Sequence, residues 1–238
     1  MKEVDKLQKL IDESNNIVFF GGAGVSTESG LKDFRGKNGL YKEKSKYSPE
    51  FLLSIMCLVT NPELFFDYYK SNLNYKNVLP NITHKYLASL EEKGKLKAVI
   101  TQNIDGLHQA AGSKKVIELH GTTKKAYCMK CHKEYDGETI FKSKGIPECE
   151  CGGIIRPDIV LYGEMLSEAY SLASYYILHA DLLIVAGTSL TVEPASGMLK
   201  IFKGKNLVII NEDETPYDYM ANLLIQEPLG EIFSKLKI

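Results

Sequence analysis

Short apolar runs recur along the chain, and each ends in a turn of small or polar residues. The runs cover residues 17–20, 97–100, 115–118, 182–186 and 207–210. Their length, their β-branched residues and the turn formers beside them predict buried strands. Because parallel strands end along one edge of a sheet, the five turns predict a pocket there for a long, polar, phosphate-bearing ligand.

Helical periodicity fills the intervals between these runs. It predicts one helix over residues 2–14, three over 50–93, one over roughly 167–179, one beginning near Pro194, and a closing helix with Leu229 and Ile232. Strands that alternate with helices predict an α/β fold, with a Rossmann-like parallel sheet and helices on both faces. A further apolar strand over 154–161 is expected to continue this series.

The chain is expected to divide into three parts. Residues 1–30, 95–121 and 156–238 are assigned to the large sheet domain, 31–94 to a helical insertion with a loop, and 122–155 to a small domain. With 238 residues, of which 44% are hydrophobic, the chain can bury a core of this size.

A glycine-rich loop follows the first predicted strand. Gly22-Ala23-Gly24-Val25-Ser26-Thr27 resembles the dinucleotide motif, with Thr27 in place of the third glycine. Such glycines let the backbone approach a pyrophosphate, whose charge the N–H groups of the next helix can accept. We find no clear acidic residue at the end of a second strand, which disfavours an ordinary Rossmann dehydrogenase.

The segment from Ser29 to Gly36 has the composition of a loop that closes over a ligand. Two glycines bracket Asp33, Phe34 and Arg35. The alternative is a surface turn that buries the phenylalanine. Only Arg35 and Arg156 are arginines, so each is a candidate for a place that needs a planar, forked donor.

Four cysteines predict a metal site. Cys128 and Cys131 are separated from Cys149 and Cys151 by 17 residues, and in a reducing compartment a disulfide framework is the poorer explanation. Four thiolates make a closed tetrahedral Zn²⁺ site, which is structural because no coordination position stays open. His132 is expected to be an exposed neighbour and not a fifth ligand.

Charge and hydropathy narrow the class of partner. The formal net charge of −1 argues against a polyanion as the main partner, so no direct nucleic-acid binding is expected. No apolar run has the length of a membrane span, and the amino terminus is charged with no apolar signal segment. We therefore expect a cytoplasmic protein.

Several separated motifs together resemble the sirtuin family, the NAD-dependent protein lysine deacylases. They follow one another from residue 17 to about 218, which is nearly the whole chain. The matching segments are Gly22–Ser26 with Glu28–Gly30, Asp33–Gly36, Thr101–His108 with Ala111–Gly112, Leu119–Gly121, the four cysteines, Arg156–Val160, Tyr162–Glu164 and Gly187–Leu190.

The resemblance implies two co-substrates, NAD and an acyl-lysine protein or peptide, and one structural Zn²⁺ per chain. His120 is expected to be the general base, and Asn103 to be the second catalytic residue. The expected products are free lysine, nicotinamide and O-acetyl-ADP-ribose. The expected NAD contacts are Gly22, Ala23, Gly24, Ser26, Thr27, Asp33, Phe34, Arg35, Gln102, Asn103, Ile104, Asp105, His120, Gly187, Thr188, Ser189, Asn211 and Glu212.

The resemblance also implies that the substrate peptide binds as an added strand. Its expected contacts are Val160, Leu161, Tyr162, Gly163, Glu164 and Leu190. Sirtuins that favour succinyl-lysine carry a tyrosine and an arginine three apart in the region of residues 62–72. This chain has Phe66 and Tyr69 there, which predicts acetyl or longer apolar acyl groups.

Three alternatives remain open at this stage. The same cofactor pocket could serve ADP-ribosyl transfer or plain NAD hydrolysis. A zinc-ribbon module could sense NAD or contact nucleic acid without turnover, although no basic stripe supports nucleic-acid contact. His120 could be a structural histidine whose hydrogen bonds are all made within the protein.

Overall fold

The computed structural model describes residues 2–33, 39, 46–165 and 167–238. Its larger sheet contains six strands, and every neighbouring pair is parallel. The five expected strands are confirmed, and Leu223–Ile225 adds a sixth that is too short to give a sequence signal. The strands are β1 (Ile17–Gly21), β2 (Leu96–Thr101), β3 (Val116–Glu118), β7 (Leu182–Ala186), β8 (Asn206–Ile210) and β9 (Leu223–Ile225).

The strand order creates a ligand-binding position. It runs β3-β2-β1-β7-β8-β9, so β1 pairs with β2 on one side and with β7 on the other. The chain leaves β1 toward one half of the sheet and later returns to build the other half. Crevices that bind ligands form at the carboxyl ends of strands at such a switch point.

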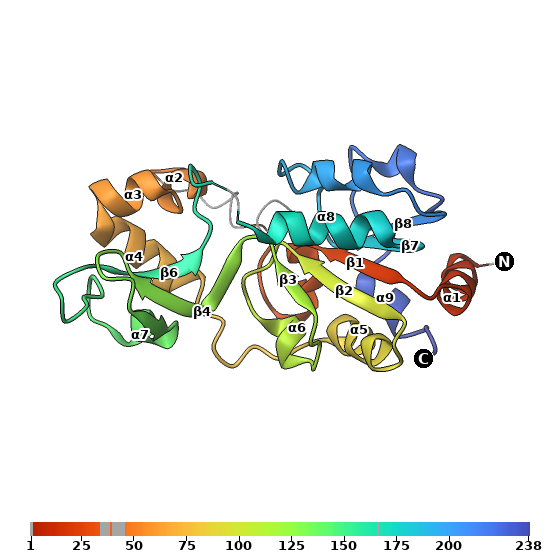
Figure 1. Ribbon diagram of the computed structural model, residues 1–238, viewed down its shortest axis with the longest axis horizontal. Helices are drawn as coiled ribbons and strands as arrows, with labels where there is room; N and C mark the ends of the chain where they lie inside the picture. The colour runs from red at the N-terminus through yellow and green to blue at the C-terminus, as the bar shows by residue number, and fades with distance from the viewer. Residues whose placement is uncertain (1, 34–38, 40–45, 166) are drawn as a thin grey trace.

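Two layers of helices bury the faces of this sheet (Figure 1). Ile17 and Phe19 of β1 face α1 (Glu3–Glu13), α5 (Ile82–Glu92) and α9 (Leu229–Phe233). Val18 and Phe20 face α8 (Ala169–His179) and a 3₁₀ helix over Ser196–Ile201, where a helix was expected near Pro194. Because both faces are buried, the strands are uniformly apolar. None of the described helices combines the length and apolarity that crossing a bilayer requires.

A second, antiparallel sheet lies beside the first (Figure 1). It consists of β5 (Glu134–Asp136), β4 (Gly121–Cys128) and β6 (Ile155–Ile159), in that order. The short helix α7 (Glu138–Lys142) packs against β4 and β6. The strand expected to continue the parallel series is therefore β6 of this smaller sheet. The expected boundary at residue 156 falls inside β6, and the division into domains stays a prediction.

Four helices, not three, occupy the interval 50–93. They are α2 (Pro49–Leu52), α3 (Ile55–Thr60), α4 (Pro62–Asn72) and α5. Ser48, Ser54 and Asn61 each accept a backbone N–H at a helix start, and these closely spaced caps divide the segment. Helices α2–α4 pack on the small sheet, whereas α5 packs on the large one.

Two buried histidines meet beneath the large sheet. His84 on α5 and His108 on α6 (Leu107–Ala110) have ring centroids 4.7 Å apart and are at most 1% exposed. Burial lowers the pKa of His84 to about 4. Burial, and then the neighbouring His84, lower the pKa of His108 to about 3. Both rings are therefore neutral in the folded protein at physiological pH.

This pair predicts acid sensitivity of the fold. Below pH 6.5 both histidines bind protons in the unfolded chain but stay neutral in the folded protein. The free energy of unfolding should therefore fall as the pH is lowered from 6.5 to about 4. Two histidines contribute a slope of about 2.7 kcal/mol per pH unit. Urea titrations at several pH values measure this slope of the free energy of unfolding against pH. His108→Phe should flatten the slope, and His179→Gln, which replaces an exposed side chain, should leave it unchanged. Equal slopes in all three proteins would contradict the assignment.

Candidate functional site

A cleft of about 390 Å³ opens where the carboxyl ends of the parallel strands face the small sheet. The segments that follow β1, β2, β3, β7 and β8 all reach it, as does the segment after β6. The structure thus brings most expected site residues together. Those that line the cleft are Ala23, Gly24, Asp33, Gln102, Asn103, Ile104, His120, Val160, Leu161, Tyr162, Gly163, Glu164, Gly187, Thr188, Ser189 and Asn211.

Backbone packs directly on backbone at the switch point. The N–H of Gly24 donates to the carbonyl of Gly187 over 2.8 Å, and a Cβ at Gly24 would lie 2.8 Å from Gly187 atoms. Gly187 itself has φ +59°, which favours glycine. The loops after β1 and β7 are therefore free of side chains where they touch, and a nucleotide can approach their backbone closely.

The helix expected after the glycine loop is absent from the described part of that segment. Two 3₁₀ turns, Ala23–Val25 and Thr27–Ser29, take its place. Gly30 ends the second turn in the left-handed conformation, with φ +89°, and Ser26, Thr27 and Ser29 favour turns over helix interiors. Any phosphate contact here must use turn N–H groups and not a helix terminus.

Ser26 links two polar residues of the β2 loop. Its hydroxyl donates to the carboxylate of Asp105 over 2.7 Å and accepts from the amide of Asn103 over 3.1 Å. Burial raises the pKa of Asp105, while the hydrogen bonds from the Leu107 N–H and from Ser26 oppose that shift. All three side chains are nearly fully buried, so the network fixes the loop that forms one wall of the cleft.

Gln102 connects the β2 loop with the β7 loop. Its side-chain oxygen accepts the Thr188 hydroxyl over 3.0 Å, and its backbone carbonyl accepts from His120. Its buried amide nitrogen finds no partner among the described residues. Gln102 thereby ties together the loops that follow β2, β3 and β7 beside the cleft.

His120 directly precedes β4, and its ring nitrogens have different partners. Nδ1 lies 3.0 Å from the carbonyl oxygen of Gln102, and Nε2 lies 3.2 Å from the hydroxyl of Tyr170. Burial lowers the pKa of His120, and the bond to Gln102 partly offsets that shift. Because a carbonyl can only accept, Nδ1 carries the proton, which leaves Nε2 as a basic nitrogen in the cleft.

Arg156 holds the segment after β6 in shape. Its guanidinium forms a forked ion pair with Glu164, in which Nη2 and Oε2 are 2.9 Å apart, and Nη2 also donates to the carbonyl of Ile159 over 2.8 Å. Burial alone would raise the pKa of Glu164, but Arg156 and the Leu161 N–H lower it. Arg156 thus occupies a place that needs a planar, forked donor.

The remaining expected residues lie around this cleft or outside it. Thr27 and Glu212 line an adjoining hollow of about 130 Å³, together with Asp33 and Asn211. Gly22 abuts Thr188, Leu190 is buried in the core, and Ser26 and Asp105 support the cleft wall. Phe34 and Arg35 lie outside the described residues.

The cleft also contains residues that sequence reasoning missed. They are Leu53, Leu73, Ile159, Tyr170, Val192, Glu193 and Asp213. Leu53 and Leu73 belong to the apolar stripes of the helical segment, where nothing distinguishes a cleft residue from a core residue. Only the packing of that segment beside the sheet edge brings them to the site.

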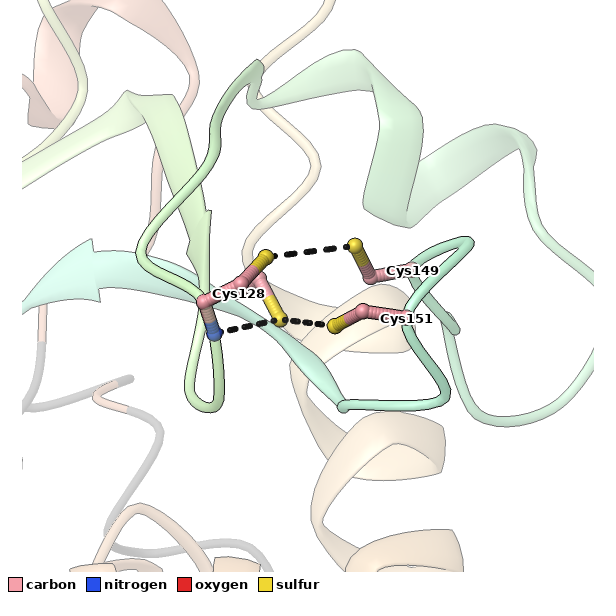
Figure 2. Close-up of side chains that lie close together, drawn as sticks. Cys128, Cys149 and Cys151 are labelled. Atoms are coloured by element: carbon pink, nitrogen blue, oxygen red, sulfur yellow. Dashed lines mark hydrogen bonds between the residues drawn. The ribbon is translucent and has the colours of Figure 1, made fainter.

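The four cysteines form one cluster. Their sulfur atoms all lie within 4.8 Å of one another, and the Cys128–Cys151 and Cys131–Cys149 pairs are 3.5 and 3.6 Å apart. Cys128, Cys149 and Cys151 converge from the end of β4 and the turn before β6 (Figure 2). A tetrahedral Zn²⁺ with ligands at about 2.3 Å requires comparable sulfur separations. The donor set and its spacing fit one structural Zn²⁺.

Neighbouring groups favour the thiolate form of Cys128 and Cys149. The backbone N–H groups of Cys131 and Lys130 point at the sulfur of Cys128 and lower its pKa. The hydroxyl of Tyr135 donates to the sulfur of Cys149 over 3.0 Å. Such outer contacts orient metal ligands and stabilise their charge.

The fold and the cleft define a class: a nucleotide-binding α/β protein with a cysteine-bound metal module beside its sheet. The Sir2 family model matches residues 22–194, and the chain belongs to that family. The resemblance to the sirtuins is thereby confirmed.

Relatives and solved structures agree over almost the full chain. An NAD-dependent protein deacetylase of Clostridium perfringens is 52% identical and covers 98% of both chains. One of Staphylococcus epidermidis is 48% identical and covers 98% of this chain and 96% of its own. A solved Sir2 variant with a deacetylated p53 peptide and 3'-O-acetyl-ADP-ribose superposes with TM-score 0.91 at 42% identity, covering 98% and 96%. A Sir2 complex with p53 peptide and NAD⁺ gives 0.88 at 40%, covering 99% and 97%.

Proposed function

We propose that this protein is an NAD-dependent protein deacetylase. It removes acetyl or other apolar acyl groups from lysine side chains and yields nicotinamide, O-acetyl-ADP-ribose and free lysine. The observation that carries the proposal is the neutral imidazole of His120, whose Nε2 faces the same cleft as Asn103 and the glycine loops. The relatives bear this activity in their names.

Residue roles follow from the chemistry of the cleft. NAD would supply a ribose carbon, which the acyl oxygen attacks as nicotinamide departs, and a ribose hydroxyl, which receives the acyl group. Asn103, Ile104 and Asp105 receive the carboxamide end, with Ser26 holding two of them in place. His120 takes a proton from a ribose hydroxyl. The loops after β1, β7 and β8 bind the phosphates, the riboses and the adenine.

The protein substrate binds in the same cleft as an added strand. Val160–Glu164 and the loop after Gly187 both line this cleft, and the peptide strand is proposed to pair between them. Arg156 and Glu164 keep the first of these segments rigid, which favours main-chain pairing with an extended peptide. The near-neutral net charge supports protein substrates over nucleic acid. The cytoplasm, which keeps cysteines reduced for metal binding, is the proposed location.

The lining of the cleft predicts acyl selectivity. Leu53, Leu73 and Ile159 are apolar, and the described lining residues include carboxylates but no lysine or arginine. A succinyl carboxylate would therefore be buried without a charge partner. We expect kcat/KM to be at least roughly 10-fold higher for a butyryl-lysine peptide than for its succinyl counterpart, because about 1.4 kcal/mol suffices for that ratio.

The butyryl and succinyl peptides form a matched pair because both acyl chains have four carbons and differ in the terminal carboxylate. Initial rates of nicotinamide release for the two peptides measure the ratio, with an acetyl peptide as reference. A succinyl rate equal to or above the other two would contradict the apolar assignment.

Incubation with NAD and an acetylated peptide tests the proposed function itself. Mass spectrometry should show peptide lighter by one acetyl group, together with equal amounts of nicotinamide and O-acetyl-ADP-ribose. Neither should form without NAD. Nicotinamide release that is independent of the peptide would support NAD hydrolysis or ADP-ribosyl transfer and would overturn the proposal.

A further inference from the structure

The hydroxyl of Tyr170 contacts the proposed base. Tyr170 lies in the first turn of α8, its ring packs partly buried against the core on that face of the sheet, and its oxygen lies 3.2 Å from Nε2 of His120. It also lines the cleft. Burial raises the pKa of Tyr170 to about 12, so the hydroxyl keeps its proton near neutral pH.

The partners of His120 fix the direction of this hydrogen bond. Nδ1 must donate to the carbonyl of Gln102, because that oxygen has no proton to give. A neutral imidazole carries one proton, so Nε2 is an acceptor and Tyr170 donates to it. The single lone pair of Nε2 lies in the ring plane and accepts one good hydrogen bond. Tyr170 therefore occupies the electron pair that a general base must offer to its substrate.

The geometry points to Tyr170 as a positioning residue that caps Nε2 of His120 in the ligand-free protein and is displaced when the ribose hydroxyl of NAD enters. The identity of the displacing hydroxyl rests on the proposed function; the cap itself does not. While it is in place, the cap holds the tautomer with the proton on Nδ1. On displacement, the ribose O–H donates to the vacated lone pair and the Tyr170 O–H turns to water.

Carbethoxylation of the ligand-free protein by diethyl pyrocarbonate tests the cap without any turnover. The reagent attacks an unprotonated imidazole nitrogen, and in His120 only Nε2 carries no proton. Tyr170→Phe keeps the ring and removes the hydroxyl, so His120 should react roughly 2- to 10-fold faster, the range that one hydrogen bond corresponds to. Peptide mass spectrometry measures the rate at each histidine, with exposed His179 as the internal reference.

Tyr176→Phe is the matched control, because Tyr176 is a partly buried tyrosine of the same helix outside the cleft lining. It should leave the rate at His120 unchanged, and melting temperatures of both variants check that the fold is retained. If Tyr170→Phe does not accelerate the modification, or if Tyr176→Phe accelerates it equally, the cap is overturned, whether or not the protein deacetylates peptides.

Steady-state kinetics then test the displacement. Tyr170→Phe removes the competing hydroxyl. It should therefore raise kcat/KM for NAD in deacetylation by a factor similar to that for carbethoxylation. Faster carbethoxylation together with a lower or unchanged kcat/KM would overturn competition between the two hydroxyls. Absence of deacetylation in the wild-type protein would instead overturn the proposed function, while the carbethoxylation result would still decide the cap.

Discussion

Replacement of His120 by alanine is expected to lower NAD-dependent deacetylation by a factor of roughly 10²–10⁴, the usual contribution of a general base. NAD binding should change little, because the proposed nucleotide contacts also include the glycine loops, Gln102 and the Asn103 network, which stay intact without the imidazole. Initial rates with an acetylated peptide measure the first quantity, and calorimetric titration with NAD measures the second. His179→Ala, at an exposed position on α8, is the control.

The wild-type pH profile should carry the signature of the same residue. His120 acts as a base only when neutral, and burial lowers its pKa below the ordinary 6.5. The acid limb of kcat/KM should therefore lie below pH 6.5, and activity should rise as the pH increases through it. A variant that loses NAD affinity in proportion to activity, or a limb that persists in His120→Ala, would contradict the assigned role.

The parallel sheet was predictable because its strands are buried on both faces and therefore appear as uninterrupted apolar runs. The runs at 17–20 and 182–186 correspond to β1 and β7 almost residue for residue. The cysteine cluster was equally predictable from the sequence, because metal ligands must be spaced closely within each pair. β9 has three residues, and such a short segment carries no periodicity.

Other features depend on contacts between distant segments. Nothing in the local sequence indicates that the strand over Ile155–Ile159 pairs with β4, because its apolar character suits either sheet. Likewise, Tyr170 is one of 14 tyrosines, and only its distance to His120 marks it. The glycine loop was predicted from its motif, but its continuation as 3₁₀ turns was not. The residues after the loop favour turns and caps over a helix interior, and the glycine motif carries no information on that preference.

Removal of Zn²⁺ is expected to unfold the small sheet and to leave the parallel sheet folded. Structural zinc contributes apparent binding free energies of about 10–16 kcal/mol in small zinc modules, which lack a sufficient core of their own. Cys128 and Cys149 share one apolar cluster with Leu58 and Phe66, so α3 and α4 should lose protection as well. β1, β2, β7 and β8 belong to separate clusters.

Hydrogen exchange with and without prolonged chelation measures this effect. Amides of β4, β6 and α4 should exchange faster by several orders of magnitude, while those of β1 and β7 remain protected, and added Zn²⁺ should restore the original pattern. Cys128→Ser should reproduce the loss. Cys57→Ala, at a buried cysteine that is not one of the four predicted metal ligands, should retain one Zn²⁺ per chain.

Activity should fall together with this protection, because the small sheet is continuous with the site. β4 begins at the residue after His120, and Val160 donates its N–H to the carbonyl of His120 over 2.9 Å. Loss of β4 and β6 therefore frees both His120, the proposed base, and residues 160–164, the proposed peptide-binding segment, although neither belongs to the four-cysteine cluster. We expect deacetylation to fall at least roughly 10-fold, the effect that small displacements of catalytic groups produce. If exchange in β4 stays slow after complete removal of Zn²⁺, the metal does not hold this module together.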